Sequence, residues 1–387
     1  MNLEAPLLSA IQDLGFIEPT PIQEQSIRLI REGKDLIGQS DTGSGKTAAF
    51  GLPILEKIQP SAGLQAFILS PTRELADQIA KNLMQFSKYK RCKIMTIYGG
   101  VSINPQIDGI RSADIIVGTP GRTLDHLRRG TLSLQRIKFL VLDEAAKMFE
   151  MGFIDDITQI MRATPRNKQI LMFSATISQD IQRVILKQMN NPASIKTSTH
   201  VSEKMLQQIY YNVRRNEKFS LLVHIIKTEN PELAIVFCGR KTEIRVVVKN
   251  LVKQGIDASE IHGGLSQNKR NFVMDQFKQG RINVLVATDV AARGIDVAHL
   301  THIINYSIPK TSQEYVHRIG RTARMGHAGV AINLLDETEH DKFRAVLSDR
   351  SLNIEKRDVP VFPKIDLQRV NFESSHGLNR FRGRGPP

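Results

Sequence analysis

A glycine-rich segment near the start of the chain, residues 40–47 (SDTGSGKT), carries the residue types that bind nucleotide phosphates. Glycines let backbone N–H groups approach phosphate oxygens, while Lys46 can reach the outer phosphates and Thr47 can hold Mg²⁺. Ser40 stands where this motif usually has its first glycine, so the match to the pattern is incomplete. A short apolar run before the loop and a helical pattern after it supply the strand, loop and helix that the motif needs.

An acidic pair follows a second apolar run about a hundred residues later. Residues 137–142 (IKFLVL) predict a buried strand, and Asp143 and Glu144 come directly after it. In doubly wound sheets, ligands bind at the carboxyl ends of the strands. Taken alone, residues 40–47 could be a plain glycine turn, and the acidic pair could lie in a solvated loop. Together the two motifs predict a site for a nucleoside triphosphate.

Length and composition limit the classes of protein that the chain can belong to. Its 387 residues exceed the usual size of a single core, so two domains of roughly 200 residues are expected. The formal charge of +14 favours a polyanionic partner, although many basic proteins are simply basic. No run of eighteen apolar residues occurs, and the N-terminal segment with Glu4 and Asp13 resembles neither a signal peptide nor a transit peptide. We therefore expect a soluble, cytoplasmic protein that does not bind membranes.

The two cysteines, Cys92 and Cys238, lie far apart in the sequence and lack the paired spacing of zinc or redox sites. They suggest buried thiols, and disulfides are not expected. Nothing in the chain resembles a heptad seam, so a monomer is expected.

Short apolar runs alternate with helical patterns in two successive stretches, which predicts two α/β domains with mostly parallel sheets flanked by helices. A polar segment without periodicity separates them and predicts a linker. The tail interleaves arginine and glycine, and we expect it to be disordered, either contacting single-stranded nucleic acid or merely solvated. The predicted parts are an N-terminal domain at 1–197, a linker at 198–206, a C-terminal domain at 207–365 and a basic tail at 366–387. Strands are expected at 66–70, 93–100, 114–120, 139–144, 169–176, 234–240, 258–264, 283–289, 302–309 and 329–335, with a helix at 267–279.

Polar residues and glycines cluster just past the carboxyl ends of these predicted strands, where ligand contacts concentrate in α/β sheets. For any single cluster, a turn or a helix cap is the competing interpretation. The clusters lie at 71–73, 99–100, 119–122, 174–176 and 288–289.

In the order and spacing of its motifs, the sequence resembles the DEAD-box RNA helicases over nearly its whole length. The matching segments are GFIEPTPIQ (15–23), SDTGSGKT (40–47), PTRELA (71–76), the glycine pair 99–100, TPGR (119–122), DEAA (143–146), SAT (174–176), IVFCGR (235–240), SQNKR (266–270), ATDVAARGID (287–296) and HRIGRTAR (317–324). The resemblance implies two tandem RecA-like domains that share one ATP site and one RNA site.

The resemblance implies ATP and Mg²⁺ as cofactors. Phe16 would stack on adenine, unless it is an ordinary core residue, and Gln23 would hydrogen-bond the edge of the base, which selects ATP over GTP. Asp296 would touch the nucleotide sugar, with a cap or turn role as the alternative. The full set of expected nucleotide contacts is Phe16, Gln23, Ser40, Thr42, Gly43, Ser44, Gly45, Lys46, Thr47 and Asp296.

The resemblance also gives each catalytic residue a role in ATP hydrolysis. Asp143 would hold Mg²⁺ together with Thr47, and Glu144 would orient and deprotonate the attacking water. Arg321 and Arg324 would come from the second domain as arginine fingers, so hydrolysis would require the domains to close.

RNA would be bound mostly through phosphate and 2′-OH groups, without sequence specificity from the core. ATP and single-stranded RNA together would close the domains into a shape that a continuous duplex cannot fit, and hydrolysis would release the RNA. The expected RNA contacts are Pro71, Thr72, Arg73, Gly100, Thr119, Gly121, Arg122, Gly263, Arg270, Thr288 and Gly294; Ser174, Thr176 and His317 would couple the domains.

The chain departs from the family at one important position, because Ala146 replaces the last aspartate of the DEAD motif. By resemblance, that carboxylate hydrogen-bonds Ser174 and the region of His317. Its loss could leave buried donors without partners at a cost of roughly 1 to 3 kcal/mol each. The sequence therefore leaves two alternatives to an RNA helicase. One is an ATP-gated RNA clamp or scaffold that unwinds poorly, and the other is a DNA helicase with the same two-domain architecture.

Overall fold

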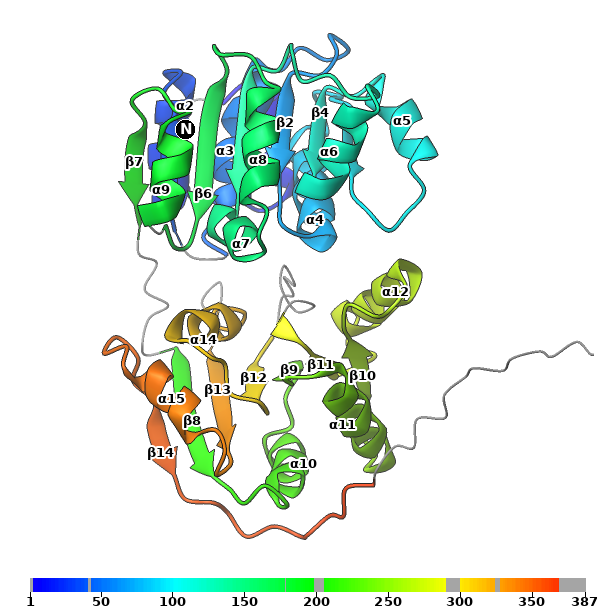
Figure 1. The fold of residues 1–387 in the computed structure, drawn as a ribbon, viewed down its shortest axis with the longest axis vertical. Helices are drawn as coiled ribbons and strands as arrows, with labels where there is room; N and C mark the ends of the chain where they lie inside the picture. Colours follow the sequence, from blue (N-terminus) through cyan, green and yellow to red (C-terminus); the bar gives the residue numbers. More distant parts are fainter. Residues whose placement is uncertain are drawn as a thin grey trace, which may run out of the picture.

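The computed structural model describes residues 3–40, 43–177, 179–197, 205–289, 300–323 and 328–368, and forms two α/β lobes (Figure 1). The first lobe is built on a parallel sheet whose strands lie in the order β3-β4-β2-β5-β6-β1-β7. These strands are β1 (Leu36–Gln39), β2 (Ala66–Leu69), β3 (Ile94–Ile97), β4 (Ile115–Gly118), β5 (Phe139–Asp143), β6 (Gln169–Ser174) and β7 (Ala193–Lys196).

Helices cover both faces of the first sheet, because alternate side chains of its strands enter two separate apolar cores. One core joins the sheet to α1–α4, and the other joins it to α5–α9. The helices are α1 (Ala5–Asp13), α2 (Pro21–Arg31), α3 (Lys46–Lys57), α4 (Arg73–Phe86), α5 (Asn104–Ile110), α6 (Pro120–Arg128), α7 (Ala145–Glu150), α8 (Ile154–Arg162) and α9 (Gln179–Leu186).

The second lobe repeats the strand order of the first. Its parallel sheet runs β10-β11-β9-β12-β13-β8-β14, so the third, fourth, second, fifth, sixth, first and seventh strands of each lobe are neighbours in that order. The strands are β8 (Leu206–Asn212), β9 (Ala234–Phe237), β10 (Ala258–Ile261), β11 (Val284–Ala287), β12 (His302–Asn305), β13 (Gly329–Leu335) and β14 (Glu355–Arg357). The two lobes are therefore two copies of one architecture.

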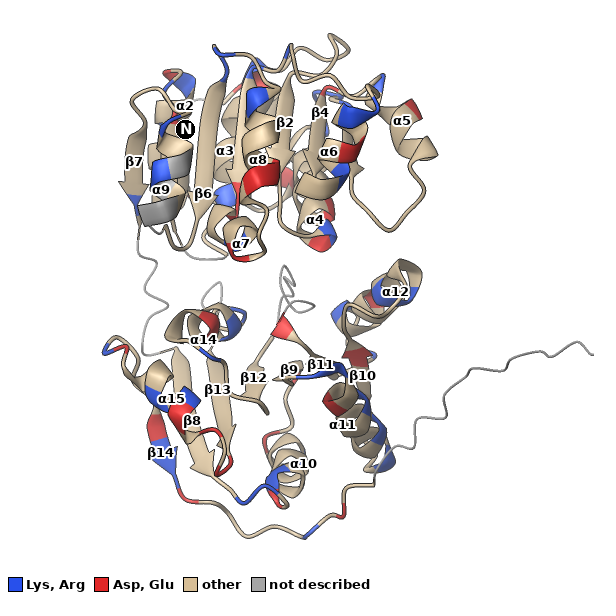
Figure 2. Cartoon of the chain, viewed as in Figure 1, with Lys and Arg blue, Asp and Glu red and all other residues tan. Residues whose placement is uncertain are grey.

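The second sheet is also covered on both faces. Helices α10 and α11 pack on one face, while α12, α14 and α15 pack on the other. These helices are α10 (Lys218–Glu229), α11 (Lys241–Lys253), α12 (Gln267–Lys278), α14 (Ser312–Ile319) and α15 (His340–Leu347). Figure 2 shows that the central strands carry few charged residues, whereas most charges lie on helices and loops.

The predicted fold class is confirmed, and every predicted strand overlaps an observed one. Three strands were not predicted, namely β7, β8 and β14. Strand β8 begins at Leu206, the last residue of the predicted linker. Its side chains alternate only weakly between buried and exposed, and β7 and β14 are short edge strands with exposed residues, so none of them produces a strong apolar run.

The prediction of two buried thiols is wrong for Cys92, which is only partly buried, whereas Cys238 is fully buried; both are free. Within the described residues, no helix is long and apolar enough to cross a membrane. Several predicted features fall outside the described residues: Thr42, Gly294, Asp296, Arg324, residues 198–204 of the linker and the tail from 369 onward.

Candidate nucleotide and RNA sites

The phosphate loop lies between β1 and α3, as the sequence predicts. Gly43 and Gly45 have φ angles of +84° and +89°, which residues with a side chain rarely adopt. A Cβ atom on Gly45 would lie 2.2 Å from the Gln23 amide nitrogen. Glycine is therefore required at position 45 for both its backbone conformation and its close packing.

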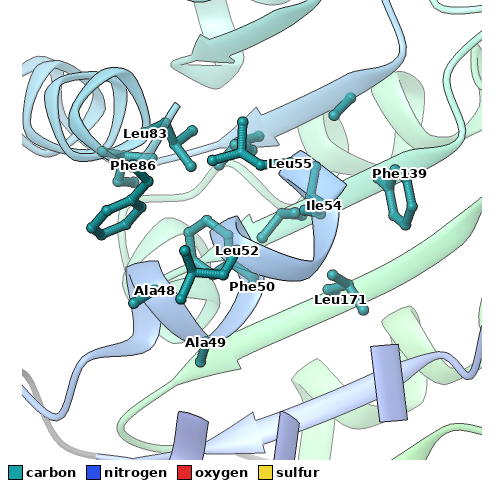
Figure 3. Packing of buried hydrophobic residues seen from close by; sticks show 14 of the residues in the cluster. Ala48, Ala49, Phe50, Leu52, Ile54, Leu55, Leu83, Phe86, Phe139 and Leu171 are labelled. Atoms are coloured by element: carbon teal, nitrogen blue, oxygen red, sulfur yellow. The ribbon is translucent and has the colours of Figure 1, made fainter. Parts of the chain in front are cut away.

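Helix α3 holds the loop in place because most of its length is buried. Ala48, Ala49, Phe50, Leu52 and the following apolar residues pack against α4 and the sheet (Figure 3). Lys46 is the first residue of this anchored helix and Thr47 the second. The core therefore fixes the backbone positions from which both side chains extend.

Short hydrogen bonds tie the loop to itself and to α2. The hydroxyls of Ser40 and Ser44 are 2.8 Å apart, and the Thr20 hydroxyl donates to the Ser44 carbonyl at 2.8 Å. Ser40, which breaks the usual glycine pattern, thus contributes to the shape of the loop.

Gln23 is buried, and both ends of its amide are engaged. Its nitrogen donates to the Gly45 carbonyl at 3.3 Å, and its oxygen accepts from the Thr20 backbone N–H at 3.0 Å. The second bond is part of a capping box that starts α2.

Phe16 is 41% exposed and meets Phe86 edge to face. Phe16 therefore has a ring surface open to a ligand, while Gln23 links α2 to the phosphate loop.

Lys46 and Glu144 form a buried ion pair at the centre of the site. The Lys46 ammonium lies 2.8 Å from Glu144 Oε1 and donates to the Ser40 carbonyl at 3.1 Å. Burial alone would raise the pKa of Glu144, but Lys46 and Lys147 hold it below its ordinary value. Glu144 is therefore a carboxylate at neutral pH.

Asp143 lies beside this pair in a different electrostatic environment. Burial raises the pKa of Asp143 above its ordinary value, and the charge of Glu144 adds to this effect while Lys46 opposes it. Its Oδ1 atom is buried and has no hydrogen-bond partner within the described part of the chain. A buried oxygen of this kind fits a divalent cation, which would supply the missing positive charge.

The described residues contain no group of three or more His, Cys, Asp or Glu side chains that could hold a metal ion. Mg²⁺ commonly keeps several waters and binds through one or two protein ligands together with substrate phosphates. Thr47 and Asp143 fit that requirement.

The backbone of Ala146, rather than its side chain, provides a hydrogen-bond partner for Ser174. The Ala146 backbone N–H donates to the Ser174 hydroxyl oxygen at 3.2 Å, and both residues are buried. Ser174 therefore keeps a partner in the backbone. The Ser174 carbonyl also accepts from the Ser40 backbone N–H at 3.1 Å, which links β6 to the phosphate loop.

The lobes contact each other beside the predicted SAT motif (174–176) of the first lobe. Gln313 on α14 donates to the Thr176 hydroxyl at 2.6 Å. A cavity of about 780 Å³ lies beside this bond and is lined from both lobes, including Ala146, Thr176, Val316 and His317. His317 is also near enough to help lower the pKa of Glu144. Thr176 and His317 thus line one cavity, whereas Ser174, the third predicted coupling residue, does not.

A second group of contacts joins α4 to α12. Arg73 donates to the Gln267 side chain at 3.2 Å, and Arg270 lies 2.9 Å from the Glu74 carboxylate. In Figure 1, α4 and α7 lie at the edge of the first lobe that faces α12 and α14 of the second. Arg321 is buried at the end of α14, where its backbone N–H donates to the Arg318 carbonyl.

The predicted RNA residues of the first lobe lie at strand ends and helix starts. Thr72 caps α4 by accepting from the Leu75 N–H at 3.4 Å, with Pro71 preceding it. Gly100 has a φ of +80°, and a Cβ atom there would lie 2.1 Å from the Arg73 guanidinium. The backbone at Gly100 and the side chain of Arg73 are thus in direct contact.

The remaining first-lobe RNA residues surround the start of α6. Thr119 is its N-cap, and Gly121 has open space beside it. Arg122 donates to the Val101 carbonyl at 3.1 Å, while its Nη1 atom is buried without a partner among the described residues.

In the second lobe, Gly263 and Thr288 line a cavity of about 1190 Å³ together with Arg240, Lys241 and Lys310. Arg270 does not belong to that cavity and lies at the contact with α4.

The prediction missed four residues that complete these contacts: Thr20, Glu74, Gln267 and Gln313. The first three lie inside the matched segments, so their positions were visible in the sequence. Their partners were not, because each contact joins elements that are distant along the chain.

A glycine-rich loop that carries a buried lysine lies beside an Asp-Glu pair at the carboxyl edge of a parallel sheet. This arrangement defines a nucleoside-triphosphate-binding protein with two similar lobes. The family model for DEAD/DEAH box helicases matches residues 20–184, and that for the helicase conserved C-terminal domain matches residues 217–326. The chain belongs to the DEAD/DEAH box helicase family.

Two relatives are similar over most of their length. The DEAD-box ATP-dependent RNA helicase CshA of Bacillus subtilis (strain 168) is 44% identical, covering 89% of this chain and 70% of that protein. The ATP-dependent RNA helicase CshA of Limosilactobacillus reuteri is also 44% identical, covering 88% of this chain and 69% of that protein.

Solved structures support the arrangement of the lobes as well as the fold. Saccharomyces cerevisiae Dbp5 bound to RNA and ADP BeF3 gives a TM-score of 0.84 at 31% identity, covering 92% of this chain and 94% of Dbp5. A DEAD box protein from Methanococcus jannaschii gives 0.56 at 41% identity, covering 92% of this chain and 98% of that one. The higher similarity therefore belongs to the less identical protein, which is the one bound to RNA and nucleotide.

Proposed function

We propose that this protein is an ATP-dependent RNA helicase that closes its two lobes around ATP and RNA, locally separates short duplexes and releases the RNA after hydrolysis. The observation that carries the proposal is the position of the Lys46, Asp143 and Glu144 cluster. It lies at the edge of the first lobe that contacts α14 of the second through Thr176 and Gln313. Neither lobe alone contains all the groups that the reaction needs.

The first lobe binds and orients ATP. Phe16 offers its exposed ring to adenine, and Gln23 joins base recognition to the phosphate loop. The backbone N–H groups of residues 43–45 and the Lys46 ammonium bind the phosphates. Thr42 and Asp296, expected to contact the nucleotide, belong to the same proposal.

Mg²⁺, held by Thr47 and Asp143, would neutralise charge on the phosphates. Glu144 orients the attacking water and accepts its proton. When Lys46 turns from Glu144 to the phosphates, Glu144 loses the partner that depresses its pKa and becomes a stronger base. Binding of the substrate thus prepares the base.

The second lobe completes the site with Arg321 and Arg324, whose charges stabilise the transferred phosphoryl group. His317 lies across the cavity from Ala146, near enough to influence Glu144. Closure of the lobes is therefore coupled to chemistry.

RNA lies across both lobes along the loops that follow the strands. In the first lobe the contacts come from helix starts and from the backbone at Gly100, which suits phosphate recognition. In the second lobe, Gly263 and Thr288 line a cavity together with several Lys and Arg side chains.

Two free thiols fit a reducing compartment, and we infer that the protein acts in the cytoplasm.

A second candidate function is an ATP-gated RNA clamp that hydrolyses ATP but separates strands poorly. Ala146 favours it, because this residue lines the cavity between the lobes and has no carboxylate that could form a hydrogen bond across it. The catalytic pair Asp143 and Glu144 is intact, so the change affects coupling between the lobes more than the chemistry.

The test is to measure RNA-stimulated ATP turnover and unwinding of a short RNA duplex side by side, for the chain and for Ala146→Asp. We expect RNA to stimulate turnover and both proteins to unwind, with Ala146→Asp increasing the strands separated per ATP hydrolysed by several-fold, since a charge-assisted hydrogen bond across the cavity is worth roughly 1.5–3 kcal/mol. Persistent RNA binding with ATP but negligible unwinding would select the clamp. Turnover that does not respond to RNA would contradict both functions, and stronger stimulation by DNA than by RNA would favour a DNA helicase.

A further inference from the structure

A buried hydrogen-bond network lies behind α14 in the second lobe, and its centre is Arg318. The guanidinium forms two bonds to the Asp289 carboxylate, at 2.6 and 2.7 Å. Its third nitrogen, Nη1, donates to the Asn305 side chain at 2.8 Å and to the Ser307 carbonyl at 2.6 Å. Arg318 is only 4% exposed, so its orientation is fixed by these partners.

The network continues into the sheet through two buried asparagines. Asn305 on β12 donates to the Asn333 side-chain oxygen on β13 at 2.8 Å. Asn333 in turn donates to the Ile209 carbonyl on β8 at 2.9 Å and to the Tyr315 hydroxyl at 3.3 Å. The Tyr315 hydroxyl donates to the Gln208 side chain at 3.1 Å. Asn305 and Asn333 are fully buried, and β12, β13, β8 and α14 are joined through side chains.

Asn333 determines how the network is arranged. An amide has one acceptor and two donor hydrogens, and Asn333 uses its oxygen toward Asn305 and its nitrogen toward β8 and α14. This arrangement turns the Asn305 oxygen toward Arg318. A fully satisfied polar network in a core gives a single arrangement rather than several.

We propose that Asn333 is a positioning residue for ATP hydrolysis. Acting through Asn305 and Arg318, it fixes α14 and the Arg318 carbonyl, to which the Arg321 backbone N–H donates. It also fixes Asp289, the last described residue of the loop after β11. Asn333 touches neither nucleotide nor RNA. The inference rests on the proposed function, in which Arg321 stabilises the transferred phosphoryl group.

The chain offers a matched control for the loss of a buried asparagine in the same lobe. Asn250 on α11 is 4% exposed and also makes three hydrogen bonds, to the Val246 carbonyl and to both backbone groups of Gln368. It has no link to α14 among these bonds. Asn333→Leu and Asn250→Leu should therefore destabilise the lobe to a similar degree, and only the first should disturb Arg318.

The experiment compares the two variants in the full chain by denaturant unfolding, by binding of a fluorescent ADP analogue without RNA, and by RNA-stimulated ATP turnover. For Asn333→Leu we expect kcat to fall about tenfold, the size of effect expected when a hydrogen bond to a charged group is lost. Its affinity for the ADP analogue should stay within about twofold, because the first lobe is intact. Asn250→Leu should keep kcat within about twofold.

A second pair of variants makes the test independent of the stability of Asn333→Leu. Asn305→Asp keeps an oxygen for Arg318 but replaces the donor to Asn333 with a second acceptor, so it should lower kcat about tenfold, as Asn305→Leu should. The fall for Asn305→Asp would not follow from lost packing, because aspartate has nearly the same size and shape as asparagine.

Equal kcat values for Asn333→Leu and Asn250→Leu would overturn the proposal, as would an unchanged kcat for Asn305→Asp. Failure of the proposed function is a different result. In that case Arg321→Ala would leave turnover unchanged, whatever the asparagine variants do.

Discussion

The two lobes share one strand order but use the same position of the sheet in different ways. In each lobe a helix follows the first strand and begins at a buried lysine, Lys46 at the start of α3 and Lys218 at the start of α10. In the first lobe a glycine-rich loop precedes the lysine, whereas residues 213–217 (VRRNE) of the second contain no glycine.

The partners of the two lysines explain the different outcomes. Lys46 pairs with Glu144, while the neighbouring Asp143 keeps a buried oxygen without a described partner. Lys218 contacts the carboxylates of both Asp336 and Glu339, and its ammonium lies over the Tyr306 ring, 5.3 Å from the centroid.

The acids around Lys218 are satisfied further by the fold. Glu339 accepts from the Ile308 backbone N–H at 2.9 Å, and Asp336 accepts from the backbone N–H and the hydroxyl of Thr338. At the equivalent position of the second lobe, the lysine and its acidic partners thus satisfy one another in a buried ion cluster. In the first lobe, the corresponding ion cluster is incomplete, so it can bind phosphates and a cation.

Removing each lysine should have the largest effect. Lys46→Ala should lower ATP turnover by about 10²- to 10³-fold, the usual cost of losing a charge-stabilising donor at the reacting group. Lys218→Met should instead lower the free energy of unfolding by about 3–5 kcal/mol, because it leaves two buried carboxylates without their cation. Turnover assays, nucleotide binding and denaturant unfolding measure these effects.

For Lys218→Met, nucleotide affinity should match that of the unchanged chain wherever the protein is folded. If Lys218→Met weakened nucleotide binding as much as Lys46→Ala does, the second lobe would hold a functional phosphate site and the comparison would be wrong.

A milder change tests whether the strand ends of the first lobe are shaped for RNA. Gly100→Ala should weaken the binding of single-stranded RNA about tenfold, because its Cβ atom would displace Arg73 and a hydrogen bond to a charged group is worth roughly 1.5–3 kcal/mol. Fluorescence anisotropy with labelled RNA and a non-hydrolysable ATP analogue measures this effect.

Gly63→Ala is the matched control, since Gly63 has a φ of +82° and nothing within 4 Å of its missing Cβ. It should carry the strain without the loss of RNA affinity. Equal losses for the two variants would show that the effect at Gly100 is only one of stability.

Much of the fold could be predicted from the sequence, because buried parallel strands are nearly continuous apolar runs. Strand β2 (AFIL) and strand β9 (AIVF) are fully buried, and each was predicted. Strand β8 (LQQIYYN) was not, because it mixes amides with apolar residues and is held by pairing with β13 over seven residues. Pairing between distant segments leaves little trace in the local pattern.

The candidate site likewise has a part that the sequence could predict and a part that it could not. Lys46, Thr47, Asp143 and Glu144 lie in two local motifs, and the 2.8 Å contact between Lys46 and Glu144 joins those motifs as the sequence predicts. The capping role of Gln23 and the backbone partner of Ser174 required the contacts between elements. The Lys218 cluster joins residues more than a hundred positions apart, so no local motif could predict it.

In the proposed mechanism, the reaction chamber is completed only when the second lobe supplies a positive charge to the nucleotide held by the first. Measuring RNA-stimulated ATP turnover for Arg321→Ala, with Arg321→Lys as the control that keeps the charge, tests it most directly. We expect Arg321→Ala to lose about 10³-fold or more in kcat. Its affinity for a fluorescent ADP analogue without RNA should be unchanged, and Arg321→Lys should recover part of the rate. Turnover by Arg321→Ala equal to that of the unchanged chain would contradict the account.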